Sequence, residues 1–200
     1  MPRLILASGS PRRSKLLNEL GVDFEVRPVE IDESLRAGES PQNLVVRLAR
    51  EKATAKKAPE ALILAADTMV ILDGEALGKP DDEAAAREML LRLAGKTHTV
   101  VTGVALCDVD RDTLVADLEL SDVQIGPMSE EEIDWYVATG EPLDKAGSYA
   151  IQGLGAMFVG SVFGNYSNIV GLPLPLTRAL FRKLGFDLRQ FRKTGKPRSI

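Results

Sequence analysis

The sequence predicts an α/β fold, built as one domain in which two small lobes can share a cleft. Short apolar runs of strand character alternate along the chain with segments of helical spacing, which is typical of α/β domains. No internal repeat, low-complexity tract or linker rich in proline and glycine divides the 200 residues. Apolar residues make up 44% of the chain and charged residues 27%, a composition that supports a sizeable buried core.

In the first part of the chain, apolar runs alternate with helices whose starts are marked by Ser-Pro. Serine caps a helix N-terminus, proline suits its first turn, and glycine is common just past its end. The elements predicted here are a strand at 4–7, a helix that begins at Ser10-Pro11 and ends at Gly21, a strand at 24–29, and a helix that begins at Ser40-Pro41 and extends to Ala55.

The middle of the chain predicts mostly strands. An apolar run at 61–66 ends in Asp67-Thr68, and Asp73-Gly74 is the strongest short hairpin signal in the sequence. The elements predicted here are a strand at 61–66, hairpin strands at 69–72 and 75–77, a helix at 82–93 that Gly95 ends, and long strands at 97–107 and 113–125.

The last part of the chain predicts helices around a glycine-rich segment. Ser129, followed by Glu132 three residues later, forms a capping box that begins a helix. The remaining elements are short strands at 149–151 and 157–159 and a helix at 173–184. We therefore expect a single domain at residues 1–188 and a flexible basic tail at 189–200, a solubilising end rather than a nucleic-acid arm.

Charge and residue counts exclude several kinds of function. The net charge of −4 leaves no excess positive charge for binding nucleic acid through a basic face. The single Cys107 excludes a disulfide framework, and the single His98 excludes a multi-histidine metal site, so we interpret both as structural. No apolar segment has the length of a signal peptide core or a membrane span, which predicts a cytoplasmic protein without a membrane partner.

The segment after the first strand is a candidate anion site. A Ser-Gly-Ser turn leads into a helix whose first amides carry partial positive charge, and the hydroxyls of Ser8 and Ser10 add donors. Arg12 and Arg13 lie in the first helical turn, where cations oppose the helix dipole, so a bound anion would account for them. The alternative is an ordinary helix cap with two solvated arginines.

Three further segments carry charged candidates. Asp67 follows an apolar strand, at the edge where α/β sheets place their ligands, and its burial favours a metal or a cation as partner. Lys79 follows a predicted hairpin and precedes a proline, so its ammonium group can reach an oxyanion, and Lys52 is a second candidate lysine. Asp32 and Glu33 offer hard oxygen ligands for Mg²⁺. Each of these residues also has a simpler interpretation. Asp67 could accept backbone hydrogen bonds in a turn, and the lysines and the acidic pair could lie on a solvated surface.

Gln152 precedes two glycines that let the backbone approach a ligand closely. Its amide both donates and accepts hydrogen bonds, which is the capacity needed to read the edge of uracil or thymine. The alternative is a glycine-rich turn between two strands.

Six segments, taken together and in order, resemble the Maf-like family of nucleoside triphosphate pyrophosphatases. They are LASGSPRR at 6–13, LAREKA at 48–53, AADTMV at 65–70, GKP at 78–80, EPLDKAGSYAIQGLGA at 141–156 and NYSNIVGLP at 165–173. The resemblance implies a mixed central sheet flanked by helices, with two lobes around a deep cleft similar to that of inosine triphosphate pyrophosphatases. It also implies a homodimer.

The resemblance assigns roles to nine of the residues. It implies that Asp67 is the catalytic acid or base, and that phosphate groups are bound by Ser8, Arg13, Lys52 and Lys79. The branch specific for dTTP and UTP is similar to this chain at Arg12, Thr68 and Gln152. A divalent metal ion, Mg²⁺ or Mn²⁺, is expected at Asp67 and Glu33, with Asp32 as the alternative acid because the two are adjacent.

The implied reaction is hydrolysis of dTTP or UTP, and of modified pyrimidine nucleotides, to the monophosphate and pyrophosphate. A different class of function stays open, because the family's link to septum formation also implies a nucleotide-binding regulatory protein of cell-division arrest. A phosphatase that releases orthophosphate is a third alternative, which product analysis separates from the first.

Overall fold

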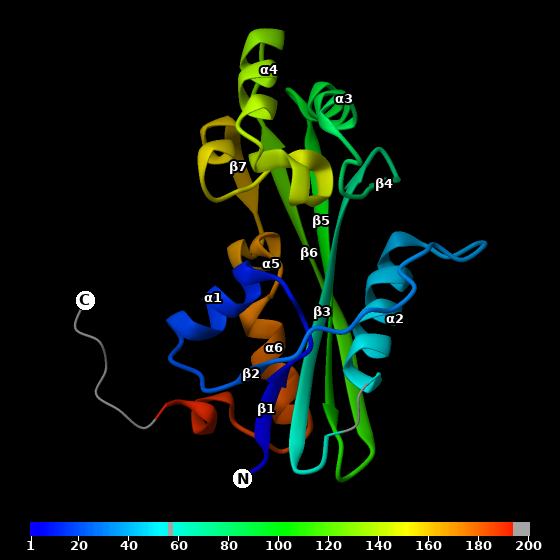
Figure 1. Cartoon of the computed structure of the whole chain (residues 1–200), viewed down its shortest axis with the longest axis vertical. Helices are drawn as coiled ribbons and strands as arrows, with labels where there is room; N and C mark the ends of the chain where they lie inside the picture. Colours follow the sequence, from blue (N-terminus) through cyan, green and yellow to red (C-terminus); the bar gives the residue numbers. More distant parts are fainter. Residues whose placement is uncertain (56–57, 194–200) are drawn as a thin grey trace.

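In a computed structural model, described at residues 1–55 and 58–193, the chain forms a mixed sheet with helices on both faces (Figure 1). The strand order is β2-β1-β3-β5-β6-β7, and β4 pairs with β3. β1 is parallel to β2 and β3, whereas the other neighbours are antiparallel. The strands are β1 (Arg3–Leu6), β2 (Glu25–Val26), β3 (Ala61–Leu72), β4 (Glu75–Leu77), β5 (Thr97–Asp108), β6 (Thr113–Ile125) and β7 (Val159–Phe163). The predicted α/β class with a mixed, helix-flanked sheet is confirmed.

Side chains of β1 and β3 alternate between the two faces of the sheet, because successive residues of a strand point in opposite directions. Leu4 and Leu64 pack on one face with α1 (Pro11–Glu19) and α6 (Leu174–Lys183). Ile5 and Ile63 pack on the other face against α2 (Pro41–Thr54). Burial of both faces fixes the strand register, since a slip by one residue would exchange the two sets.

A separate apolar cluster lies at the other end of the long strands. There α3 (Glu83–Leu93) and α4 (Glu130–Ala138) pack together with Val70, Val100 and Val123. Figure 1 shows these helices at the end of the molecule opposite the N-terminus. The remaining elements are the 3-10 turns η1 (Glu141–Asp144), η2 (Ala146–Ser148), η3 (Leu154–Phe158) and η4 (Leu188–Phe191), and the short helix α5 (Tyr166–Val170).

β3 has an open stretch of edge in its middle. β1 pairs with residues 61–64 and β4 with residues 70–72, so within the described chain no strand covers 65–69 on this side. The carbonyl oxygen of Leu64 accepts a hydrogen bond from Ala7 N on the open side, whereas that of Ala61 accepts one from Val109 N on the side of β5. Because backbone groups alternate in direction along a strand, the N–H and C=O groups of the even-numbered residues of β3 point toward the open edge. Asp67 and Thr68 lie in this stretch, where a ligand can approach the sheet edge-on.

The close approach of α2 to the sheet depends on Gly103. This residue is paired with Asp67 in the ladder between β3 and β5. A Cβ atom at position 103 would lie 2.4 Å from the carbonyl oxygen of Val45 in α2. The absence of a side chain therefore lets α2 pack directly over the strand that faces Asp67.

Several local predictions are confirmed. Ser40 accepts a hydrogen bond from Asn43 N at the start of α2, and the capping box of Ser129 and Glu132 begins α4. The hairpin turn between β3 and β4 has positive φ at Asp73 and Gly74, as its two-residue loop requires.

Strand predictions are wrong in three parts of the chain. The strand predicted at 24–29 shrinks to β2, whose two residues are both exposed, so it has no buried face to extend it. The runs at 61–66 and 69–72 are one strand, since Asp67 and Thr68 pair with Gly103 and Thr102 in β5. The strands predicted at 149–151 and 157–159 are replaced by 3-10 turns and loop, and β7 begins only at Val159.

The predicted tail boundary at residue 189 lies inside a packed segment. Phe191 is buried, its ring lies 5.4 Å from that of Phe181, and its carbonyl accepts a hydrogen bond from Asp23 N. Residues 194–200 of the predicted tail lie outside the described residues. In the described part of the chain, no helix combines the length and the apolar character needed to cross a membrane.

Candidate functional site

A cavity of about 660 Å³ lies along the open edge of β3. Ligand sites commonly enclose about 300–1,000 Å³, so this space suits a nucleotide-sized molecule. The turn after β1, helix α2, strand β3 and the segment after η1 all contribute to its walls. The structure brings all nine predicted site residues to this one cavity: Ser8, Arg12, Arg13, Glu33, Lys52, Asp67, Thr68, Lys79 and Gln152.

A lysine shared by two carboxylates forms the first charged group of the cavity. Lys52 Nζ lies 2.7 Å from Asp67 Oδ1 and 2.6 Å from Glu33 Oε1. The side chains of Lys52 and Asp67 are nearly buried, whereas Glu33 reaches in from an exposed loop. The lysine uses one oxygen of each carboxylate, which leaves the second oxygen of each available to water or a metal ion.

The choice between the two adjacent acids falls on Glu33. Glu33 lines the cavity and contacts Lys52, whereas Asp32 accepts a hydrogen bond from Ser34 N in its own loop. Asp32 does not line the cavity. Of the two acids, Glu33 is therefore the one that shares the cavity and the Lys52 ammonium with Asp67.

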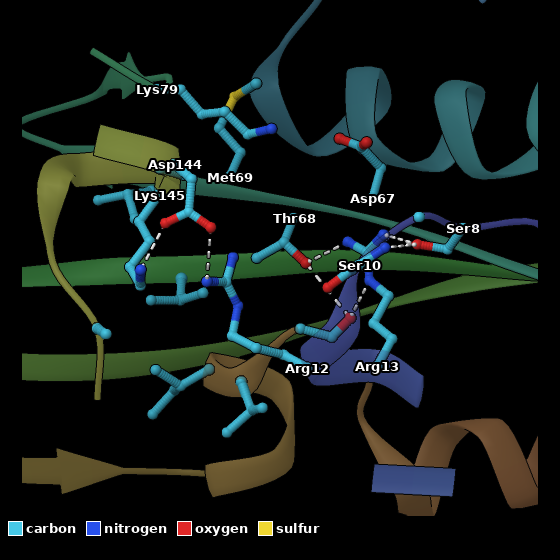
Figure 2. Close-up of a pocket in the computed structure, with 18 of the residues that line it drawn as sticks. Ser8, Ser10, Arg12, Arg13, Asp67, Thr68, Met69, Lys79, Asp144 and Lys145 are labelled. Atoms are coloured by element: carbon cyan, nitrogen blue, oxygen red, sulfur yellow. Dashed lines mark hydrogen bonds and ion pairs between the residues drawn. The ribbon is translucent and has the colours of Figure 1, made fainter. Parts of the chain in front are cut away.

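Arg13 is held rigidly by neutral oxygens. Its Nη1 donates to Ser8 Oγ at 2.9 Å, its Nη2 to Thr68 Oγ1 at 3.1 Å, and its Nε to Gly171 O at 2.8 Å (Figure 2). Desolvation lowers the pKa of Arg13, and the charge of Asp67 opposes that shift. A desolvated guanidinium bonded only to neutral partners keeps its full charge available to an anionic ligand.

The first turn of α1 is open toward the cavity. Ser10 occupies the cap position with extended backbone, but its side chain makes no capping hydrogen bond, so the predicted cap is wrong in this respect. The first amides of α1 are therefore left to a ligand, and Ser10 itself lines the cavity. This arrangement supports the predicted anion site.

Lys79 approaches from another wall. It lies between Gly78 and Pro80 beyond β4, it is exposed, and it lines the cavity. Within residues 1–55 and 58–193, no carboxylate partner is recorded for it. Its ammonium is accordingly free to meet a phosphate group.

Glu141 organises the segment that carries Gln152. Its carboxylate accepts hydrogen bonds from Tyr136 Oη at 2.8 Å, Leu154 N at 3.0 Å and Gly155 N at 2.9 Å. Gly153 adopts positive φ, and a Cβ there would lie 2.4 Å from Glu141 Oε2. The glycine predicted to permit close approach thus admits this carboxylate rather than a ligand, and Gln152 is placed beside it.

Asp144 and Lys145 form a second charged group with Arg12, which the sequence did not reveal. Lys145 Nζ donates to Asp144 Oδ1 at 2.5 Å and to Glu141 O at 2.6 Å, and Arg12 Nη1 lies 3.7 Å from Asp144 Oδ2. Burial would raise the pKa of Asp144, but the hydrogen bond and charge of Lys145 and the charge of Arg12 hold it below its usual value. The only sequence signal was the EPLDK string, which carried no assigned role.

A buried polar network supports Thr68 from behind. Thr68 Oγ1 lies 3.0 Å from Thr102 Oγ1, and Thr102 donates to Asn168 O at 3.1 Å. The Asn168 amide in turn donates to Val100 O and Ser121 Oγ. Thr68 is thus fixed in the middle of the cavity wall.

His98 has the structural role predicted for it. Its Nε2 lies 2.8 Å from Tyr149 Oη, and the two rings meet edge to face. Burial lowers the pKa of His98 to about 4, so the imidazole stays neutral. This contact orients Tyr149, which lines the cavity.

The acidic residues suit a metal ion that arrives with its ligand. Among residues 1–55 and 58–193, no group of three or more His, Cys, Asp or Glu side chains could hold a metal ion. Mg²⁺ in phosphoryl-transfer sites is commonly bound by one or two carboxylates, with phosphate oxygens and water completing its shell. Asp67 and Glu33, which line the same cavity, fit that pattern.

Comparison with known proteins points to one family. A family model described as Maf-like protein matches residues 3–184. The dTTP/UTP pyrophosphatase of Anaeromyxobacter dehalogenans (strain 2CP-C) is 52% identical over 193 residues, covering 94% of this chain and 96% of that protein. The dTTP/UTP pyrophosphatase of Symbiobacterium thermophilum is 50% identical over 190 residues, covering 94% of this chain and 97% of that protein. The solved Ham1 protein of Staphylococcus aureus has a TM-score of 0.42 and 14% identity, covering 62% of this chain and 71% of its own.

Proposed function

The chain belongs to the Maf-like family, and from this premise we propose that it hydrolyses UTP and dTTP to the monophosphate and pyrophosphate. Relatives at about half identity over nearly the full chain carry the name dTTP/UTP pyrophosphatase, which supports the substrate. The observation that carries the proposal is convergence: one cavity contains the Asp67 carboxylate and the cations Arg13, Lys52 and Lys79. Modified pyrimidine nucleotides are further candidate substrates.

In the proposed reaction, Asp67 activates the attacking water. Lys52 fixes one carboxylate oxygen of Asp67, and the other accepts a proton from water. The water oxygen forms a bond to the α-phosphorus, and the bond from that phosphorus to the bridging oxygen breaks, so that pyrophosphate leaves with the electron pair. Glu33 and Asp67 would hold Mg²⁺ or Mn²⁺ with the nucleotide, and the metal would supply Lewis-acid stabilisation of phosphate charge.

The cations and the open helix start are proposed to stabilise the negative charge of the triphosphate. Arg13 is fixed before the substrate arrives, so it need not reorganise when charge develops. Ser8 and the first amides of α1 add neutral donors beside it. Lys79 adds an exposed cation from another wall of the cavity.

Arg12, Thr68 and Gln152 are proposed to select the base. They line the same cavity as the charged groups, and Figure 2 shows Arg12 on the side of Thr68 away from Asp67. Recognition by hydrogen bonds discriminates strongly between bases, because a wrong base leaves polar groups of the protein without a hydrogen-bond partner. Asp67 beside Lys52 favours turnover over a purely regulatory nucleotide-binding role, since a sensor needs no carboxylate to activate water.

A nucleotide panel with product analysis tests this function. UTP, dTTP, CTP, GTP and ATP would each be incubated with Mg²⁺ or Mn²⁺, and the products would be separated. We expect pyrophosphate and a monophosphate, with UTP and dTTP cleaved fastest. Equal rates on GTP and UTP would contradict the base specificity, and orthophosphate as the product would contradict the reaction.

The homodimer implied by the family resemblance and the cytoplasmic location predicted from the lengths of the apolar segments are also proposed. Exposed apolar side chains on β6, β7 and α5, those of Leu120, Phe163 and Tyr166, offer a surface that a second copy could cover. Light scattering on the purified chain tests the dimer, and a mass of one chain at micromolar concentration would contradict it. Fractionation of the source cells tests the location.

A further inference from the structure

Arg12 and Arg13 are neighbours in the first turn of α1, yet they are held in different ways. Arg13 donates through three nitrogen atoms to Ser8, Thr68 and Gly171. Arg12 has one recorded partner in the described chain, Asp144, at 3.7 Å. The position of the Arg12 guanidinium therefore depends on a single residue from another segment.

Asp144 is itself anchored. Lys145 is mostly buried and donates both to Asp144 Oδ1 and to the carbonyl oxygen of Glu141. The Glu141 carboxylate is in turn bonded by the amides of Leu154 and Gly155. A continuous set of contacts thus links Arg12 to the segment that carries Gln152.

We propose that Asp144 is a positioning residue for nucleotide selection, which holds the Arg12 guanidinium against the cavity before the nucleoside arrives. The inference rests on the proposed function and adds a residue to it. Without Asp144, Arg12 would face the positive end of the helix dipole and the like charge of Arg13, and it would turn toward solvent. A donor fixed in advance loses less conformational entropy when the ligand binds.

The effect should fall on binding rather than on the chemical step. Figure 2 shows the Asp144–Arg12 pair on the opposite side of Thr68 from Asp67. Lys52 and Glu33, the partners of Asp67, make no recorded contact with Asp144 among the described residues. Loss of Asp144 therefore leaves the proposed water-activating group intact.

Asp144→Asn tests the proposal, since it removes the charge and keeps the shape. Binding of α,β-methylene-UTP, which resists cleavage at the α–β bridge, would be titrated together with the kinetics on UTP and GTP. We expect Kd and KM to rise about three- to tenfold, the equivalent of immobilising one long side chain on binding. The preference for UTP over GTP should narrow, kcat should change less than twofold, and Asp144→Glu should restore most of the affinity.

A control variant and a double variant separate the positioning of Arg12 by Asp144 from the effect of simply removing one negative charge. Asp134→Asn removes the same charge from an exposed ion pair with Arg87 that does not line the cavity, so it should behave as the wild type. In an Arg12→Ala background, Asp144→Asn should cause no further loss, because Asp144 acts through Arg12. Additive losses in the double variant would overturn the proposal.

The binding measurement also distinguishes failure of this inference from failure of the proposed function. A wild-type chain that binds α,β-methylene-UTP but releases no pyrophosphate would contradict the reaction, and Asp144→Asn would still be judged by Kd. Unchanged or tighter binding by Asp144→Asn would overturn the inference while the reaction stands. A wild-type chain that does not bind the analogue would overturn both.

Discussion

Lys52 on α2 and Asp67 on β3 meet at the open edge of the sheet, with Nζ 2.7 Å from Oδ1. The same ammonium group binds Glu33, so one buried cation keeps two carboxylates together. The site is therefore assembled by the fold, and a ligand would complete it rather than create it.

Asp67→Asn should abolish most turnover and leave the fold intact. The amide cannot accept the proton of the attacking water, and a lost general base commonly costs about 10²–10⁴ in rate. Pyrophosphate release from UTP measures the effect, with thermal unfolding as the check on folding. The matched control is Asp117→Asn, an exposed partner of Lys183, which should retain full activity. Hydrolysis by Asp67→Asn near the wild-type rate would show that another group activates water.

Chelation of divalent metal should stop turnover without loosening the protein. Lys52 pairs with the nearly buried carboxylate of Asp67, and Glu33 is largely exposed, so removing a metal leaves no unpaired buried charge. We expect EDTA to abolish pyrophosphate release, and added Mg²⁺ or Mn²⁺ to restore it. Tm without nucleotide should shift by less than about 1 °C, below the roughly 2–4 °C that 1 kcal/mol produces in a domain of this size. A large fall in Tm on chelation would indicate a resident structural metal and contradict this site.

The residues of the cavity were more accessible to sequence reasoning than the contacts that hold them. Ser8, Asp67 and Gln152 lie in short strings with recognisable chemistry, and those strings converge in the structure. Asp144 and Glu141 were not identified, because they act through 3-10 turns whose sequence has no periodic pattern.

The strand errors have a similar cause. Asp67 and Thr68 interrupt an apolar run, so local pattern ends the strand there, whereas pairing with β5 carries it through. Conversely, Tyr149 has extended backbone, but positive φ at Gly147, Ser148 and Gly153 turns the chain on both sides of residues 149–151, and no strand of the described chain pairs with them. At Asp67 and Thr68, pairing with a neighbouring strand thus overrides the local preference.

His98 should make the stability of the protein depend on pH between about 6.5 and 4. Burial lowers the pKa of His98 from 6.5 in the unfolded chain to about 4 in the folded protein. As the pH falls below 6.5 the unfolded chain binds a proton that the folded protein does not, so the free energy of unfolding decreases until the pH reaches the folded pKa. The full effect is on the order of 2–3 kcal/mol.

Urea unfolding at pH 7.5 and pH 5 measures this dependence. Because the chain has one histidine, His98→Gln removes the effect completely, and the difference between the two proteins isolates it from the titration of carboxylates. The free energy of unfolding should fall more in the wild type than in His98→Gln when the pH is lowered from 7.5 to 5. An equal decrease in the two proteins would contradict a buried, neutral His98.

Gly103→Ala should displace Lys52 from Asp67, although Gly103 itself does not line the cavity. A Cβ at this position would lie 2.4 Å from Val45 O and 2.7 Å from Val46 N, both backbone atoms of α2 that cannot rotate away. The helix must shift outward, and Lys52 moves with it, away from the strand pair of Gly103 and Asp67. We expect a loss of about 1–3 kcal/mol in the free energy of unfolding, as for other overpacked interiors.

The loss of activity from Gly103→Ala should exceed what the fraction of unfolded protein explains. Stretching the bond between Lys52 and Asp67 leaves the carboxylate misoriented in molecules that are still folded, so kcat should fall at temperatures well below Tm. Gly126→Ala is the matched control, since its Cβ would meet only Phe158 O at 3.6 Å, an ordinary contact. If both variants keep the wild-type kcat, the packing of α2 on β5 does not set the distance between Lys52 and Asp67 that turnover requires.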